Sequence, residues 1–174
     1  MLNSVGMFLW NIIVKVAHGV LVILYRIIGR ELTDEAFEGW LQFVKFGMVG
    51  FMNTIISYLI TEGGYYALRT LVHNGTFALQ ISQTVAFVIT VFISYLINNS
   101  LVFRKEEGQT RNPWKTLMRT YIAYSFTGIF LNNVLLYVEV SLLHMSPIIA
   151  PIVNIVVDVP VNFFMNKLWA YKTE

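Results

Sequence analysis

Residues 154–172, NIVVDVPVNFFMNKLWAYK, form an apolar stretch long enough to cross a membrane, yet they contain a regular series of polar side chains. These side chains recur every four residues at Asn154, Asp158, Asn162 and Asn166. On an α-helix they form a slowly winding ladder that rises about 18 Å through a hydrocarbon core about 30 Å thick. A carboxylate at that depth costs at least about 2.5–3.5 kcal/mol on insertion scales. We therefore expect this polar ladder to face a protein interior or a wet cavity and to belong to the functional site.

The whole chain has the composition of an integral membrane protein. Its 174 residues are 56% hydrophobic and 13% charged, and the net charge is +2. That charge is too small for a nucleic-acid-binding protein, and no basic patch is interleaved with stacking aromatics outside the apolar stretches. The chain has no cysteine, and its histidines lack the spacing of metal ligands, so we expect neither a metal nor a cofactor.

Four apolar stretches predict four membrane-spanning helices, at about residues 43–68, 77–103, 117–143 and 146–170. Residues 1–29 are also apolar, but polar side chains such as Lys15 and Arg26 interrupt them at helical spacing. This pattern favours an amphipathic helix lying in the membrane interface, with a fifth spanning helix as the alternative. The predicted fold class is an all-α integral membrane protein, with an N-terminal interfacial segment at 1–41 and a four-helix membrane domain at 42–174.

Basic residues between the predicted spans indicate the orientation of the chain. The 104–119 loop contains five of them, Arg104, Lys105, Arg111, Lys115 and Arg119. The connection near 69–76 has only Arg69, and the connection near residue 144 has none. Because Lys and Arg accumulate in cytoplasmic loops, both termini and the middle loop are predicted to be cytoplasmic. We expect a multi-pass protein of the plasma membrane.

An internal repeat relates the second predicted span to the fourth. A shift of 68 residues pairs Thr90 with Asp158, Ser94 with Asn162 and Asn98 with Asn166. The first and third spans match more weakly. These correspondences predict two helical hairpins, residues 42–106 and 116–174, that share one orientation about an axis along the membrane normal. Two polar ladders would then line one seam between the halves.

Three segments resemble the GtrA-like family of small membrane proteins: FVKFGMVGFMNT (43–54), SYLINNSLVFR (94–104) and NFFMNKLWAYK (162–172). The resemblance covers roughly residues 42–174. The family pattern at the end of a span is Asn, a basic residue, an intervening residue, Trp, and an aromatic residue two further on. The fourth span has the whole pattern, as Asn166, Lys167, Trp169 and Tyr171. The second span departs from it, with Asn99 replacing the basic residue and Leu101 replacing Trp.

The resemblance implies four membrane helices and a role in cell-surface polysaccharide or teichoic-acid glycosylation. Members of the family are thought to move polyprenyl-phosphate-linked sugars across the membrane, and the same module also serves as the membrane domain of some polyprenyl-phosphate sugar synthases. Cations for the phosphate are expected at Lys45, Arg104, Arg119, Lys167 and Lys172. Hydrogen-bonding groups along the path of the sugar are expected at Asn53, Thr90, Ser94, Asn98, Asp158, Asn162 and Asn166. Such groups are needed because each unpaired polar group in hydrocarbon costs several kcal/mol.

Three functions are compatible with these features. The first is transfer of a polyprenyl-phosphate-linked sugar from the cytoplasmic to the outer leaflet, driven by the gradient of the substrate. The second is a membrane anchor that docks a glycosyltransferase. The third is a small proton-coupled transporter that uses Asp158 or Glu62 as the coupling acid. No P-loop and no hydrolase motif is present, so the chain is predicted not to be an enzyme. Membrane lipid is the other expected partner, and a homodimer stays open because four short helices leave little room for a wide cavity.

Overall fold

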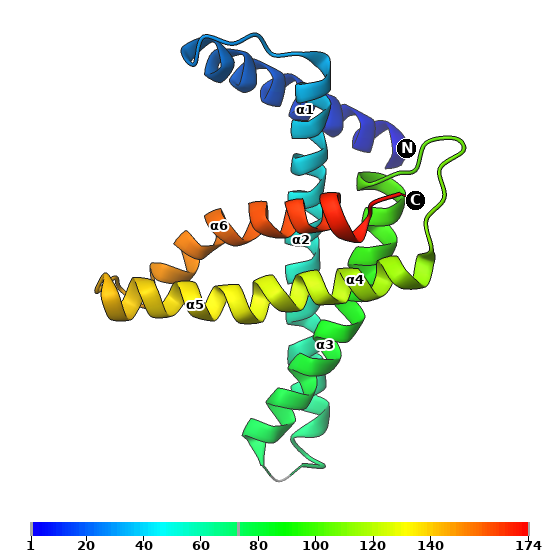
Figure 1. Ribbon diagram of the computed structural model, residues 1–174. Coiled ribbons are helices and arrows are strands. Elements are labelled where there is room, and N and C mark those ends of the chain that lie inside the picture. The colour runs from blue at the N-terminus through cyan, green and yellow to red at the C-terminus, as the bar shows by residue number, and fades with distance from the viewer. Residues whose placement is uncertain (1, 73, 174) are drawn as a thin grey trace. The chain divides into compact units, whose positions relative to one another are not determined.

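The computed structural model describes residues 2–72 and 74–173, and every regular element in this part of the chain is a helix (Figure 1). The chain forms two compact units, Met1–Lys45 and Phe46–Glu174. Helix α1, Leu2–Ile27, belongs to the first unit, and helix α2, Asp34–Leu68, contributes residues to both. The all-α fold class is confirmed.

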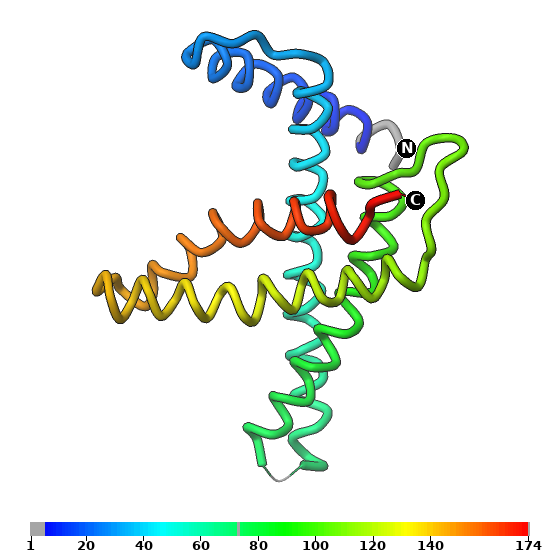
Figure 2. Tube along the Cα trace, viewed as in Figure 1, coloured from blue at the N-terminus to red at the C-terminus, as the bar shows by residue number. Residues whose placement is uncertain are grey.

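The second unit consists of the later part of α2 and two further helical segments. Helix α3 (Gly75–Ile97) continues directly into the π-helical segment η1 (Asn98–Val102). After a loop, α4 (Pro113–Ser125), η2 (Phe126–Leu131), α5 (Asn132–Leu136) and η3 (Tyr137–Leu142) form one unbroken helix. Helix α6 (Ala150–Met165) and η4 (Asn166–Ala170) then return alongside it in the opposite direction (Figure 2).

Asparagine side chains cap the N-termini of α3 and α4, each of which follows a loop. Asn74 Oδ1 accepts a hydrogen bond from the backbone N–H of Phe77 at 3.2 Å. Asn112 Oδ1 accepts from the N–H groups of Trp114 and Lys115 at 3.0 and 3.1 Å. Pro113 occupies the first turn of α4, where the missing N–H would have had no intrahelical partner. Local sequence therefore decides where α3 and α4 begin.

Four helices in the described part of the chain are long and apolar enough to cross a membrane: Gly6–Ile27, Asp34–Leu68, Gly75–Val102 and Pro113–Leu142. The last three coincide with the first three predicted spans, apart from residues 103 and 143 at the ends of the second and third. The first corresponds to the N-terminal segment, for which an interfacial position stays a prediction. The fourth predicted span, at 146–170, is not among these helices. Its asparagines and Asp158 lower the mean hydropathy of the helix that contains them.

Both spans that carry a polar ladder end in a π-helical turn. The N–H of Phe103 donates to the carbonyl of Asn98 at 2.7 Å, five residues earlier. The N–H of Tyr171 donates to the carbonyl of Asn166 at 2.8 Å over the same interval. Such turns insert one residue into a helix and occur frequently at functional sites. The two span ends thus have the same backbone geometry, and both asparagine side chains are fully buried.

A buried aromatic cluster joins these two span ends. The ring centroids of Phe103 and Tyr171 are 4.6 Å apart in a stacked arrangement. Phe163 lies 5.9 Å from Phe103, and Phe46 of α2 lies 5.5 Å from Phe163. The stack brings the residue after η1 next to the residue after η4. The residues that follow them in the chain, Arg104 and Lys172, are both exposed and basic.

Candidate functional site

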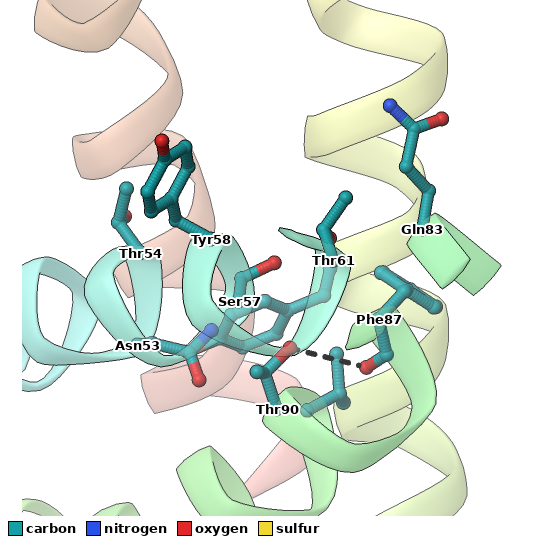
Figure 3. Close-up of a pocket in the computed structure, with 10 residues that line it drawn as sticks. Asn53, Thr54, Ser57, Tyr58, Thr61, Gln83, Phe87 and Thr90 are labelled. Carbon is teal, nitrogen blue, oxygen red and sulfur yellow. Dashed lines mark hydrogen bonds between the residues drawn. The ribbon is translucent and has the colours of Figure 1, made fainter. Parts of the chain in front are cut away.

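A polar groove of about 430 Å³ opens between α2, α3 and α4 within the second unit (Figure 3). Its lining residues are Asn53, Thr54, Ser57, Tyr58, Thr61, Gln83, Phe87, Thr90, Val91 and Tyr124. Eight of these ten side chains, all except Phe87 and Val91, carry a hydroxyl or an amide. All three helices belong to segments long and apolar enough to span a membrane. The groove therefore presents hydroxyl and amide groups, beside a larger apolar surface, within segments apolar enough to span a membrane.

Two of the predicted sugar-path residues, Asn53 and Thr90, line this groove. Asn53 Oδ1 is buried and accepts no hydrogen bond from the described residues. Thr90 Oγ1 donates to the carbonyl of Ala86 in its own helix at 2.7 Å. The Thr90 hydroxyl is therefore already hydrogen-bonded within its own helix, whereas the amide oxygen of Asn53 has no donor among the described residues.

The other polar residues predicted on α3 and η1 lie behind the groove rather than in it. Ser94 and Asn98 are fully buried. Asn98 Nδ2 donates to the hydroxyl of Tyr124 at 3.4 Å, and Tyr124 lines the groove. Asn98 thereby supports a groove residue. Tyr121 of the same helix donates its hydroxyl to the carbonyl of Val88 at 2.6 Å, which holds α4 against α3.

The polar ladder of the last helix lies mainly against neighbouring helices. Asn154 and Asn166 are fully buried, whereas Asp158 and Asn162 are half-buried. Asn166 Nδ2 donates to the carbonyl and to Oδ1 of Asn162, both at 2.8 Å. Asp158 Oδ2 accepts from Asn132 Nδ2 at 3.1 Å. None of the four ladder residues lines the groove. That the ladder faces a passage of its own stays a prediction.

Besides Asp158 and Glu62, a further acid lies inside an apolar helix, Glu139 in η3, and no sequence pattern indicated it. Its residue is only 6% exposed. The terminal atoms of the Asn154 amide lie against its carboxylate, and with the nitrogen facing Glu139 the amide donates to Oε1 and Oε2 at 3.1 and 2.9 Å. The signal available in the sequence was an acid inside an apolar stretch. It was overlooked because Glu139 does not belong to a series with four-residue spacing.

Four of the five predicted cations lie at the η1 and η4 ends of the second unit. Arg119 Nη1 donates to the carbonyl of Trp169 at 3.1 Å, with the guanidinium 5.4 Å from the ring centroid. The Lys167 ammonium lies 5.6 Å from the ring of Phe163. Arg104 and Lys172 are exposed beside the Phe103–Tyr171 stack. The fifth, Lys45, belongs to the first unit, where its ammonium lies 5.2 Å from the ring of Trp10.

A loop arginine joins this group of cations. Arg111 Nη1 donates to Asn99 Oδ1 at 2.9 Å and to the carbonyl of Phe103 at 3.0 Å. Its guanidinium lies 5.3 Å from the ring centroid of Tyr171. Burial lowers the pKa of Arg111, an effect opposed by the nearby Tyr171 and Tyr95. The Arg111 cation therefore lies at Asn99, the position where the second span lacks the basic residue of the GtrA-like pattern.

Comparison with known proteins agrees with the resemblance at the span ends. The family described as GtrA/DPMS, transmembrane domain, matches residues 45–171. No curated protein and no solved structure matches the chain. The matched residues make up most of the sequence, and they include the groove, the π-helical segments η1 and η4, the buried Glu139 and the half-buried Asp158. The chain therefore belongs to the GtrA/DPMS transmembrane-domain family.

Proposed function

We propose that this protein moves a polyprenyl-phosphate-linked sugar from the cytoplasmic to the outer leaflet of the plasma membrane, for glycosylation of a cell-surface polysaccharide or teichoic acid. Membership of the GtrA/DPMS family supports a membrane role in glycosylation. The observation that carries the transfer step is the polar groove at membrane depth. We assign no bond-making step to this chain and leave glycosyl transfer to a separate enzyme.

The groove has the size and chemistry needed by a sugar that crosses hydrocarbon. Its volume of about 430 Å³ lies within the range of about 300–1,000 Å³ that is usual for small-molecule pockets. Hydroxyl and amide groups replace the water that the sugar hydroxyls lose, which matters because an unpaired polar group there costs several kcal/mol. The unpaired Oδ1 of Asn53 is a natural acceptor for a sugar hydroxyl.

The cations at the η1 and η4 ends supply a place for the phosphate. Arg104, Arg119, Lys167 and Lys172 belong to this group, and Arg111 extends it. Basic side chains at a membrane surface attract phosphate, and guanidinium groups bind it with charge-assisted hydrogen bonds. The isoprenoid tail needs no polar partner and remains in lipid. The predicted cytoplasmic location of the middle loop would place this phosphate site on the side where the substrate is made.

The two-hairpin repeat is part of the same proposal. The π-helical turns begin at Asn98 and Asn166, which are 68 residues apart, as the sequence repeat predicts. Their closing hydrogen bonds and their buried asparagines match. These correspondences support two hairpins of one orientation, each with a cation-rich end at the same membrane surface.

Leaflet transfer in vesicles tests the proposed function. The full chain is reconstituted with a short-chain polyprenyl-phosphate sugar that carries a fluorophore, and the fraction quenched from outside is followed with time. Transfer is expected to be faster than in protein-free vesicles. Asn53→Leu should slow it by about tenfold, the effect of one hydrogen bond of about 1.4 kcal/mol. The matched control is Asn133→Leu, an exposed asparagine of α5 that bonds within its own helix.

The buried ladder of the last helix favours a second candidate function, a membrane anchor for a glycosyltransferase. Asn154 and Asn166 are sealed between helices, as expected for groups that hold a rigid scaffold together. Equal leaflet transfer with and without protein would exclude the transfer function and leave this candidate. Co-purification of a glycosyltransferase with the inactive protein would then support it.

A further inference from the structure

We propose that an apolar groove in the first unit holds one acyl chain of an anionic phospholipid, with the phosphate of that lipid beside Lys45. The groove has a volume of about 490 Å³. Its lining consists of seven aliphatic residues of α1, the first Ile12 and the last Leu24, with Trp40 and Val44 of α2. All of them belong to the unit Met1–Lys45, and we call this site the N-terminal groove. It is separate from the polar groove, and the proposal holds whether or not the protein moves a lipid-linked sugar.

The lining of the N-terminal groove leaves no polar side-chain atom for a water-soluble ligand. Eight of its nine side chains are aliphatic, and the ninth is Trp40. The one polar side-chain atom among them, Trp40 Nε1, donates to the hydroxyl of Tyr25 at 3.3 Å. An apolar cavity holds no ordered water, because a bound water needs several polar partners. The group that occupies the N-terminal groove is therefore a hydrocarbon.

Helical geometry places the N-terminal groove on the apolar face of α1. The helix that carries it is apolar enough to cross a membrane. With about 3.6 residues per turn, the middle of the groove-lining face lies more than about 130° around the helix from both Lys15 and Arg26. These two cations are exposed. The N-terminal groove therefore opens away from the polar edge of α1, on the side that faces hydrocarbon.

The length of the N-terminal groove suits a single phospholipid tail. Twelve residues separate Ile12 from Leu24, so the lining extends about 18 Å along α1 at about 1.5 Å per residue. One leaflet contributes about half of a hydrocarbon core about 30 Å thick, so its acyl chains extend about 15 Å. The groove is therefore about as long as one extended acyl chain.

One cation lies at the Ile12 end of the N-terminal groove. The Lys45 ammonium is 5.2 Å from the ring centroid of Trp10. Trp10 precedes Ile13 by three residues and is therefore its neighbour on the surface of α1. Lys45 forms no ion pair with an acid of the described residues, so its charge is available to a ligand. A cation in this place attracts an anionic headgroup and gives the site a preference for anionic lipid.

An aromatic pair bounds the other end of the N-terminal groove. Trp40 lines the groove and is bonded to Tyr25, which follows the last lining residue of α1. The rings of His18 and Phe37 meet edge to face at 5.0 Å between centroids and hold α1 against α2 within the same unit. The groove thus has a charged end at Lys45 and an apolar end at Trp40. The lipid lies with its phosphate at the first and the end of its acyl chain at the second.

Quenching of tryptophan fluorescence by brominated lipids tests this site. The full chain is reconstituted in phosphatidylcholine vesicles that contain a small, fixed fraction of phosphatidylglycerol brominated near the end of one acyl chain. A second preparation contains phosphatidylcholine brominated at the same place. The brominated phosphatidylglycerol is expected to quench the wild-type protein more strongly. That excess should disappear in Trp40→Phe, which keeps a ring in the groove and removes the indole that reports on it.

Two pairs of variants test the charged end and the middle of the groove. Titration of Lys45→Gln with the brominated phosphatidylglycerol should show an apparent affinity about fivefold weaker, the effect of one cation at a lipid surface. Lys15→Gln, an exposed lysine on the far side of α1, is its matched control and should keep the excess quenching. Val20→Phe fills the middle of the groove and should abolish the excess, whereas Val22→Phe, on the far side of α1, should keep it.

Circular dichroism establishes that each variant retains its helices. Should Lys45→Gln fail to fold, the wild-type protein in high salt replaces it. At about 1 M salt the Debye length is about 3 Å, so the preference for phosphatidylglycerol should fall while the quenching by brominated phosphatidylcholine stays the same.

Three results would overturn the lipid site. The first is equal quenching of the wild-type protein by the two brominated lipids. The second is an excess that survives in both Trp40→Phe and Val20→Phe, which would place the anionic lipid outside the N-terminal groove. The third is rapid disulfide formation between copies of Val20→Cys, in a chain that has no other cysteine, which would show that a second copy occupies the groove. None of these results bears on leaflet transfer through the polar groove.

Discussion

Arg111 Nη1 lies 2.9 Å from Oδ1 of Asn99, twelve residues earlier in the chain. Asn99 occupies the position at which the GtrA-like pattern has a basic residue, and Arg111 brings a positive charge to it from the loop. The same nitrogen satisfies the carbonyl of Phe103 at the end of η1. Arg111 therefore binds the carbonyl of the residue that follows η1 and places a positive charge at the second span end, beside Asn99.

Replacement of Arg111 tests its role as a phosphate ligand. Arg111→Gln is expected to weaken binding of a short-chain polyprenyl phosphate by about ten- to a hundredfold, the range for one lost charge-assisted interaction. Arg111→Lys should recover only part of the affinity, because an ammonium lacks the planar fork that reaches two acceptors. Binding is measured by titration in micelles at fixed ionic strength. Lys105→Gln, in the same loop, is the control, and an equal loss in both variants would indicate general attraction only.

The contact between α2 and α3 gives a prediction about stability. A Cβ atom added at Gly64 would lie 3.0 Å from Ser82 Oγ and 3.2 Å from Ser82 Cβ. Gly64→Ala should therefore force the two helices apart and destabilise the protein by about 1–3 kcal/mol. Gly63→Ala is the matched control, since nothing lies within 4 Å of its added atom. Thermal unfolding in micelles should show a lower midpoint for Gly64→Ala alone, and equal midpoints would refute this close packing.

The stack of Phe103 on Tyr171 predicts that the aromatic ring of Tyr171 stabilises both span ends. Tyr171→Leu removes the stacking contact and the ring beneath Arg111, and should cost about 2–4 kcal/mol. Tyr171→Phe keeps the ring and loses the hydroxyl, which donates to the carbonyl of Tyr95 at 3.4 Å and has the Thr120 side chain as a second hydrogen-bonding neighbour, so its cost should stay at about 1 kcal/mol, the value of one hydrogen bond. Chemical denaturation of the two variants provides the comparison. Similar losses would mean that the hydroxyl, and not the stack, matters.

The bond between Asn132 and Asp158 distinguishes a structural from a transport role for the ladder. Asp158→Asn keeps an acceptor for Asn132 Nδ2 and should change the unfolding free energy by less than about 1 kcal/mol. Asp158→Leu leaves that donor buried without a partner, at a cost of about 1–3 kcal/mol. Both should leave the initial rate of leaflet transfer within about threefold of wild type, less than 1 kcal/mol in barrier, if the groove is the path. A tenfold slower Asp158→Asn would return the path to the last helix.

The helices, the apolar spans and the helix ends can be predicted from the sequence, because each depends on residues that are close together in the chain. Apolar length and polar spacing predict an all-α membrane protein, and the asparagine caps at Asn74 and Asn112 act within three residues of themselves. The described residues include four π-helical segments, η1 to η4, and two of them, η1 and η4, begin 68 residues apart, the spacing of the polar positions in the sequence. Asn53 and Thr90 could be identified as polar groups at membrane depth from their position alone.

The residue pattern alone therefore specifies the class of protein, its helices and a set of polar residues inside apolar segments. Which of those residues line a groove and which are buried between helices depends on the packing of the helices. Arg111 reaches Asn99 across a loop, and Glu139 meets Asn154 across a hairpin. The physical reason is that helical periodicity fixes which side chains share a face, whereas the neighbour of that face depends on how separate helices pack.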